Sequence, residues 1–292
     1  MNFIFQIIIL ISKLPLKILY LFSDFIYFLI IYVVGYRKKV VLDNLRNSFP
    51  EKSEAELKKL HRKFFVNFSD YLVETAKSFT MSEHELRVRV QHINQDVFRE
   101  AEKEGKNIIL LAGHVFNWEW FNALASVIPQ DNCHPVYRNM QNEFWEEKLK
   151  LVRNRYGNQA VSANDVIKHI LKTPNDGNTV YMFVADQTPH VDEVRYGVRF
   201  LNQATPAFIG YDKLATKLDL AFIYCDMKRV KRGYYQVNYY RIYPDNEKFA
   251  PLEIVSKFHK HLENTIRKFP DNYLWSHRKW KYDHAIKTLI ED

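Results

Sequence analysis

Cysteine is scarce in this sequence, whose 292 residues contain only Cys133 and Cys225. The two stand far apart in apolar surroundings, which predicts neither a disulfide framework nor a metal site. We interpret both as reduced core residues of a protein in a cytoplasmic compartment. The eleven histidines include no H-E-x-x-H pattern, the spacing that places two zinc ligands on one helix face. The sequence therefore favours chemistry that uses no metal and no cofactor.

Several other catalytic and binding motifs are missing. No G-x-S-x-G sequence occurs, so a serine nucleophile of the hydrolase type is not indicated. The net charge is +8 and the pI is near 9.2, but the basic residues are mixed with 34 Asp and Glu. Because no zinc-finger, helix-turn-helix or RNP-like pattern accompanies this charge, we expect no nucleic-acid partner. A basic surface rich in aromatic residues suits anionic lipid headgroups or an acidic carrier protein.

Long stretches without charge are confined to the N-terminus. In residues 18–36 the only charged side chain is that of Asp24, and such a run has nearly the length needed to cross a bilayer core of about 30 Å. A second apolar run, residues 3–11, is separated from it by a basic segment containing Pro15, which should break a continuous helix. Two short helices lying in or on the membrane therefore fit as well as one span. A buried core helix of a soluble protein is the remaining alternative.

The flanks of these runs predict an orientation. No basic side chain precedes the first run and no small-residue cleavage site follows it, which disfavours a cleaved signal peptide. Arg37, Lys38 and Lys39 follow the second run directly, and the positive-inside bias places the rest of the chain on the cytoplasmic side. We expect residues 1–36 to anchor the protein in a membrane and residues 37–292 to form one catalytic domain.

Residues 37–292 alternate between helix and strand patterns. Ser53 and Glu56 have the spacing of a capping box, and apolar residues follow at helical intervals. We expect strands at residues 108–111, 133–137 and 179–185, a hairpin formed by 220–227 and 234–243, and helices at 118–128, 143–155, 163–172 and 251–269. This alternation predicts an α/β fold with a mixed, mostly parallel central sheet flanked by helices, preceded by the N-terminal hydrophobic helices.

The strongest chemical signal lies at the end of the first of these strands. The apolar run Ile108–Leu111 breaks at Gly113 and His114, and Glu119 follows after four intervening residues. A neutral imidazole can take the proton of a hydroxyl that attacks a carbonyl, and a nearby carboxylate can fix its tautomer. We predict that His114 is a general base and that Glu119 orients it. The alternative is that they cap a helix and complement its dipole.

Two more predicted strands also end in polar residues. Arg138 follows the second strand, and Asp186 and Gln187 follow the third. Ligands of open α/β sheets bind where strands end, so we expect a single cleft lined by His114, Arg138 and Asp186. A turn cap is the competing interpretation for Asp186.

The order of several residue blocks resembles a known family. These blocks are Tyr36–Lys39, Asn44–Leu45, Ser48–Pro50, Gly113–His114, Asn117–Glu119, Tyr137–Arg138, Arg153–Gly157, Asp186–Gln187 and Trp275–Lys281. From about residue 14 to about residue 281 the chain resembles the lipid A biosynthesis acyltransferases of the lauroyl or myristoyl type, within the lysophospholipid acyltransferase superfamily. A lone H-x4-E pair is weak, but the same pair with the anchor and the tryptophan-rich basic tail in this order is specific.

The resemblance implies a glycerol-3-phosphate acyltransferase-like fold and an enzyme of the bacterial inner membrane that faces the cytoplasm. Such an enzyme moves a fatty acyl chain from acyl carrier protein or a coenzyme A thioester to a hydroxyl of a saccharide lipid such as a lipid A precursor. His114 would deprotonate the hydroxyl and Glu119 would hold His114. Arg138 would contact an acceptor phosphate or help the oxyanion, and Asp186 and Gln187 match the family's third block.

The remaining matched positions carry weaker predictions. Asn117 and Arg153 are candidate substrate-binding residues, with packing and a solvated helix charge as competing interpretations. The chain has Phe200–Leu201–Asn202 where this family usually shows Phe–Phe–Gly, and we expect that segment to shape a pocket. An aminolipid or lysophospholipid acyltransferase, a thioesterase or lipid hydrolase with the same His–Glu dyad, and a non-catalytic basic membrane protein remain alternatives.

Overall fold

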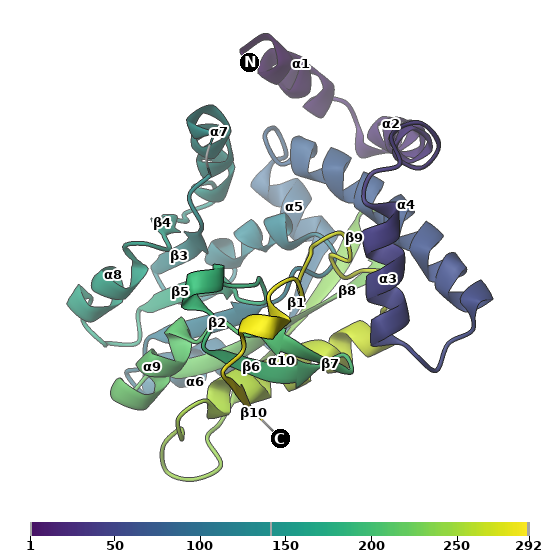
Figure 1. The fold of residues 1–292 in the computed structure, drawn as a ribbon. Coiled ribbons are helices and arrows are strands. Elements are labelled where there is room, and N and C mark those ends of the chain that lie inside the picture. Colours follow the sequence, from purple (N-terminus) through teal and green to yellow (C-terminus); the bar gives the residue numbers. More distant parts are fainter. Residues whose placement is uncertain (1, 141, 291–292) are drawn as a thin grey trace.

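The computed structural model describes residues 2–140 and 142–290, in which helices flank a central sheet (Figure 1). Within these residues the central sheet has seven strands in the order β1-β9-β8-β2-β5-β3-β4. Their bounds are Val90–Ile93 (β1), Ile108–Ala112 (β2), Asn132–Tyr137 (β3), Val161–Ser162 (β4), Thr179–Val184 (β5), Ala221–Lys231 (β8) and Tyr234–Ile242 (β9). Neighbouring strands from β8 to β4 are parallel, β9 is antiparallel to β8, and β1 is parallel to β9. The mostly parallel sheet expected from the sequence is confirmed.

The middle of the sheet forms the core. Every residue of β2 is fully buried, and β5 is buried from Thr179 to Phe183. Strands covered on both faces have continuous apolar sequences because neither face meets water. Since β2, β5 and β3 are parallel neighbours, the residues that follow them lie at the same edge of the sheet.

A helix lies at each range expected from the sequence, and the structure adds α-helices that were not expected, at Lys38–Ser48, Glu83–Arg89, Asp96–Lys103 and Gly210–Lys217. The helices of this part of the chain are α3 (Lys38–Ser48), α4 (Glu54–Lys77), α5 (Glu83–Arg89), α6 (Asp96–Lys103), α7 (Glu143–Arg153), α8 (Val166–Lys172), α9 (Gly210–Lys217) and α10 (Glu253–Lys268), with 3-10 segments at Trp118–Ser126 (η2), Val191–Glu193 (η3) and Asp283–Ala285 (η4). The capping box is confirmed at the start of α4, where the backbone N–H of Ser53 donates to Glu56 Oε2 at 2.9 Å. The helix expected after His114 is a 3-10 helix, η2.

A second, small sheet was not expected from the sequence. It contains β10 (Thr288–Ile290), β6 (Tyr196–Phe200) and β7 (Gln203–Pro206) in that order. Leu201 and Asn202 form the turn between β6 and β7 with φ of 49° and 63°, a left-handed conformation that asparagine tolerates better than most residues. Phe200 and Leu201 are fully buried and do not line the cleft described below, whereas Asn202 lines a separate pocket together with Arg199 and His259.

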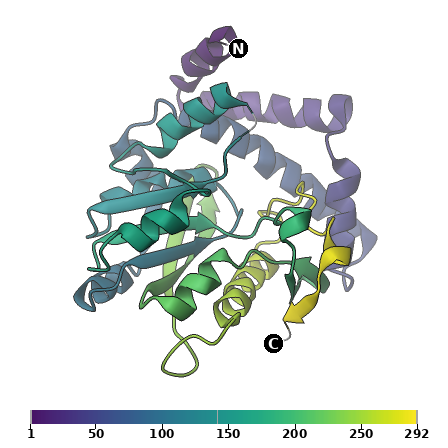
Figure 2. The same ribbon diagram turned by 60° about the vertical axis from the view of Figure 1, so that its left-hand side comes forward.

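The N-terminal residues form two helices separated at Pro15. They are α1 (Asn2–Ser12) and α2 (Leu16–Phe28), and α2 continues into a π-helical stretch, η1 (Leu29–Val34). In the part of the chain that the structure describes, Leu16–Val34 is the one helical segment long and apolar enough to cross a membrane, with a mean hydropathy of 1.9. It packs alongside α4, as Figure 2 shows. The break predicted at Pro15 is confirmed.

Candidate active site

The backbone around His114 is fixed from two directions. Gly113, at the end of β2, packs so tightly on α10 that a Cβ there would overlap the side chain of Leu262. The carbonyl of His114 accepts a hydrogen bond of 3.1 Å from the backbone N–H of Leu274. Only 8% of His114 is exposed. The strand, the helix and the C-terminal segment therefore set the position of this imidazole together.

Asp186 is the carboxylate that contacts His114. Its Oδ1 lies 2.5 Å from His114 Nδ1 and accepts the backbone N–H of His114 at 3.0 Å. Burial acts to raise the pKa of Asp186, but the charge and hydrogen bond of His114, the Lys279 ammonium and a hydrogen bond with Tyr273 hold that pKa below its ordinary value. An ionised, buried carboxylate in this place can orient the ring and stabilise an imidazolium.

Gln187 contacts the other ring nitrogen. Its Nε2 lies 3.0 Å from His114 Nε2. Because an amide nitrogen only donates, His114 Nε2 accepts here and Nδ1–H donates to Asp186. This tautomer is the one that a general base requires, since Nε2 holds the free electron pair.

Glu119 does not contact His114 as expected. Its Oε1 lies 3.2 Å from Nη2 of Arg153 on α7. Glu119 lies in the first turn of η2 and meets α7, whereas Asp186 follows β5, the neighbour of β2. The orienting carboxylate is therefore supplied across the sheet, and the expectation that Glu119 orients His114 is corrected.

An open cleft of about 410 Å³ lies beside these residues. Four further predicted site residues line it together with His114, namely Glu119, Arg138, Arg153 and Gln187. Much of the remaining wall is apolar and includes Val166, Ile167, Met182 and Phe208. Asp186 is not part of the lining and lies behind His114. The cleft is thus lined by an imidazole, two guanidinium groups and a largely apolar wall.

Asn117 lies outside this cleft. It is fully buried, and its Nδ2 donates to Oε2 of Glu74 on α4 at 2.8 Å. Glu74 also accepts hydrogen bonds from Tyr20 and Tyr235, and burial raises its pKa despite them. The structure thus places Asn117 in a buried polar cluster behind the site, and its expected contact with substrate is corrected.

Lys279 is a site residue that the motif analysis did not single out. Its ammonium is almost fully buried and donates to the backbone carbonyl of Asp186. Burial lowers the pKa of Lys279 to about 8, against the opposing effect of Asp186. The Thr188 hydroxyl donates to the carbonyl of Lys279 at 2.6 Å. The C-terminal segment is thereby tied to the loop that carries the His114 partner.

The blocks at the two ends of the sequence meet behind the site. Asn44 on α3 donates from Nδ2 to the carbonyls of Trp275 and His277, at 2.8 and 3.0 Å. Arg37 donates to the carbonyl of Ser276 at 2.8 Å. The first block therefore holds the last one in place, and the last block in turn contacts Asp186 and Thr188 through Lys279.

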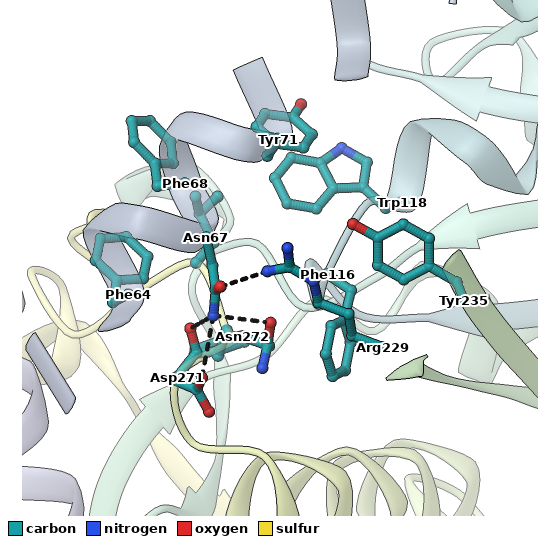
Figure 3. Close-up of a pocket in the computed structure, with 12 residues that line it drawn as sticks. Phe64, Asn67, Phe68, Tyr71, Phe116, Trp118, Arg229, Tyr235, Asp271 and Asn272 are labelled. Carbon is teal, nitrogen blue, oxygen red and sulfur yellow. Dashed lines mark hydrogen bonds between the residues drawn. The ribbon is translucent and has the colours of Figure 1, made fainter. Parts of the chain in front are cut away.

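Trp118 separates the cleft from a smaller cavity. Its ring centroid lies 4.9 Å from that of His114 and 4.2 Å from that of Tyr71. On its other side is a cavity of about 30 Å³ where, as Figure 3 shows, Arg229 points to Asn67. The guanidinium is engaged by Asn67 and Asp70 at 2.5 and 2.6 Å. A volume this small holds little more than water, so we treat the larger cleft as the site.

Neither cleft resembles a metal centre. Within residues 2–140 and 142–290, no group of three or more His, Cys, Asp or Glu side chains is placed to hold a metal ion. The chemistry available to the cleft is proton transfer at His114 and charge stabilisation by the two arginines.

Comparison with known proteins identifies the family of the chain. The family model described as bacterial lipid A biosynthesis acyltransferase matches residues 2–282. The chain is 23% identical over 243 residues to the lipid A biosynthesis acyltransferase of Haemophilus influenzae, covering 80% of this chain and 72% of that protein. It is 23% identical over 252 residues to the lipid A biosynthesis palmitoleoyltransferase of Escherichia coli strain K12, covering 84% of this chain and 79% of that protein. The chain therefore belongs to the bacterial lipid A biosynthesis acyltransferase family, and it is an acyltransferase.

Proposed function

We propose that this acyltransferase moves a fatty acyl chain from acyl carrier protein or a coenzyme A thioester to a hydroxyl of a saccharide lipid such as a lipid A precursor. The observation that carries the proposal is the arrangement of Asp186, His114 and Gln187 beside an apolar cleft. It leaves an imidazole electron pair directed at a position that a hydroxyl can occupy.

In the proposed reaction the acceptor hydroxyl replaces the Gln187 amide at His114 Nε2. His114 takes the hydroxyl proton as the oxygen attacks the thioester carbonyl carbon, and the negative charge moves to the carbonyl oxygen. Collapse of this intermediate forms the ester and breaks the carbon–sulfur bond, and the imidazolium returns its proton to the thiolate. Asp186 stabilises the imidazolium between the two steps. One positioned base contributes about 10²–10⁴-fold.

The two arginines of the cleft suit an anionic acceptor. Arg138 is exposed at the end of β3, and Arg153 is held by Glu119. A guanidinium binds phosphate or carboxylate oxygens through paired donors. In the proposal they hold an acceptor phosphate or the oxyanion, and Glu119 acts as a positioning residue for Arg153.

The proposed setting is the cytoplasmic face of a bacterial inner membrane. The net charge of +8 and the apolar N-terminal helices support attraction to anionic lipid. An acidic acyl carrier protein would be attracted by the same positive charge. Sedimentation of the purified chain with vesicles containing phosphatidylglycerol tests the membrane part, and a chain that stays in the supernatant contradicts it.

Turnover of a labelled donor tests the reaction. The purified full-length chain is incubated with acyl carrier protein carrying a radiolabelled acyl chain and with a lipid A precursor. Labelled acyl-lipid supports the proposal, whereas free fatty acid alone indicates a hydrolase and no turnover a non-catalytic protein. His114→Ala should lower transfer at least about 10²-fold. His84→Ala is the matched control and should keep full activity, because it removes an exposed imidazole that does not line the cleft.

A further inference from the structure

The N-terminal helical segment 16–34 is bound to the catalytic domain along one face. Leu16, Leu19, Ser23 and Ile31 are buried on that face, and their spacing of three to four residues and its multiples marks one side of a helix. The segment packs along α4. It is therefore part of the surface of the domain and does not project away from it (Figure 1).

Polar contacts at the middle of the segment fix this position. The hydroxyl of Ser23 donates to Oδ1 of the buried Asp70 on α4 at 2.6 Å. Asp24 accepts a hydrogen bond of 2.6 Å from Arg232, whose guanidinium also binds Asp70. Arg232 lies in the turn between β8 and β9 next to the exposed Lys231. A bilayer span for this segment would carry these charged groups into the hydrocarbon with it, which is strongly unfavourable.

The opposite face of the segment is apolar and uncovered. The exposed fractions are 69% for Leu21, 59% for Phe25 and 66% for Val33. On α1, Phe3 and Leu10 are likewise exposed, at 78% and 67%. So many large apolar side chains exposed on two consecutive helices are unusual on a soluble monomer and indicate an interaction site.

Charges at both ends of the segment identify the partner as lipid. Lys13 precedes it, Lys17 lies in its first turn, and Arg37, Lys38 and Lys39 follow it. Basic residues are retained on the cytoplasmic side and attract anionic headgroups. Because both ends are basic, this charge pattern favours keeping both on the same side of the membrane.

The same surface contacts α7, the helix whose last residue lines the cleft. The ring of Phe5 on α1 lies 6.0 Å from that of Phe144 and 6.4 Å from that of Trp145, both on α7. Arg153 of α7 forms part of the cleft wall. The two views show α1, α2 and α7 on the same side of the molecule (Figures 1 and 2).

The geometry points to an in-plane membrane contact: α1 and residues 16–34 lie parallel to the bilayer surface without crossing it, and they hold the cleft against the lipid layer from which its acceptor comes. This inference rests on the membrane association proposed above and specifies its form. It predicts that both ends of residues 16–34 remain on the cytoplasmic side, with their exposed apolar residues at one shallow depth.

Depth measurement in vesicles tests the in-plane position. Cys133 and Cys225 are buried and burial raises the pKa of both thiols, so introduced cysteines react selectively with a fluorescent maleimide. Phe25→Cys and Val33→Cys place the probe at the middle and at the end of the segment in the full-length chain. An in-plane helix gives equal quenching at both positions by lipids with a nitroxide near the headgroup. In a span, the middle position lies about 12 Å deeper along the axis, and stronger quenching there by a nitroxide deep in the acyl chain overturns the inference.

Labelling in cells tests the sidedness. In Lys13→Cys and Lys39→Cys variants, a membrane-impermeant maleimide added to intact spheroplasts should label neither position, and both should react after permeabilisation. Labelling of only the first position from outside overturns the inference. If the variants keep transferase activity in that case, the proposed function still holds. If the unmodified chain does not bind vesicles, the proposed membrane association itself is contradicted.

Discussion

Nδ1 of His114 lies 2.5 Å from Oδ1 of Asp186, a residue 72 positions further along the chain. Glu119, much nearer in sequence, contacts Arg153. Asp186 and Glu119 therefore have different partners, and substituting each of them should affect a different kinetic parameter.

Asp186→Asn should lower kcat by about 10²–10⁴-fold with a smaller effect on KM. An amide in this place can donate to Nδ1 and so favours the tautomer with the proton on Nε2, which cannot act as a base. Steady-state kinetics with labelled donor measure the effect, and circular dichroism confirms that the variant is folded. An activity within threefold of the unmodified enzyme would show that Asp186 does not act through His114.

Glu119→Gln should weaken acceptor binding more than it slows chemistry, because Glu119 holds Arg153. We expect the KM for the lipid acceptor to rise about tenfold, as for loss of a charge-assisted hydrogen bond of about 1.5 kcal/mol. Arg153→Gln should have a similar effect, and the double variant should be no worse than the poorer single one. Fully additive effects would mean that the two side chains act independently.

Asn117→Ala should destabilise the protein by about 1–3 kcal/mol, since it removes one of the three side chains that donate hydrogen bonds to the buried carboxylate of Glu74. Urea unfolding measures the change, and Asn164→Ala, at an exposed asparagine, is the control. The KM of the folded variant should be unchanged. A rise in KM without loss of stability would restore Asn117 as a substrate ligand.

Gly113→Ala should destabilise the protein by about 1–3 kcal/mol because the added methyl group overlaps Leu262 on α10. Shortening the neighbour makes room for it, so Gly113→Ala combined with Leu262→Ala should cost less than the sum of the two single changes. Thermal unfolding of the three variants measures this coupling. Additive losses would show that the two positions are not in contact.

Acid should destabilise the protein partly through His259. Burial, assisted by the charge of Lys279, lowers its pKa from 6.5 to about 3. As the pH falls below 6.5, the unfolded chain binds a proton that the folded one does not, so this histidine lowers the free energy of unfolding by about 1.4 kcal/mol per pH unit until the pH approaches 3. Between pH 7.5 and 5, His259→Gln should therefore lose about 2 kcal/mol less stability than the unmodified chain. Equal losses in urea unfolding would contradict the shift.

The sequence by itself determined the elements and the chemical groups. The apolar run before His114, the Ser53–Glu56 pair and Pro15 each act over a few residues, so local pattern was enough to predict the strand, the capping box and the helix break. It also placed Arg138 and Asp186 at the ends of strands.

Only the tertiary structure decided which of these side chains contact one another. The pairing of β2 with β5 brings Asp186 to His114, and the meeting of η2 with α7 gives Glu119 to Arg153. Lys279 reaches Asp186 because α3 holds the C-terminal segment in place. Contacts of this kind join residues far apart in the chain, and periodicity carries no information about them, because it records which face of an element is buried and not which element covers it.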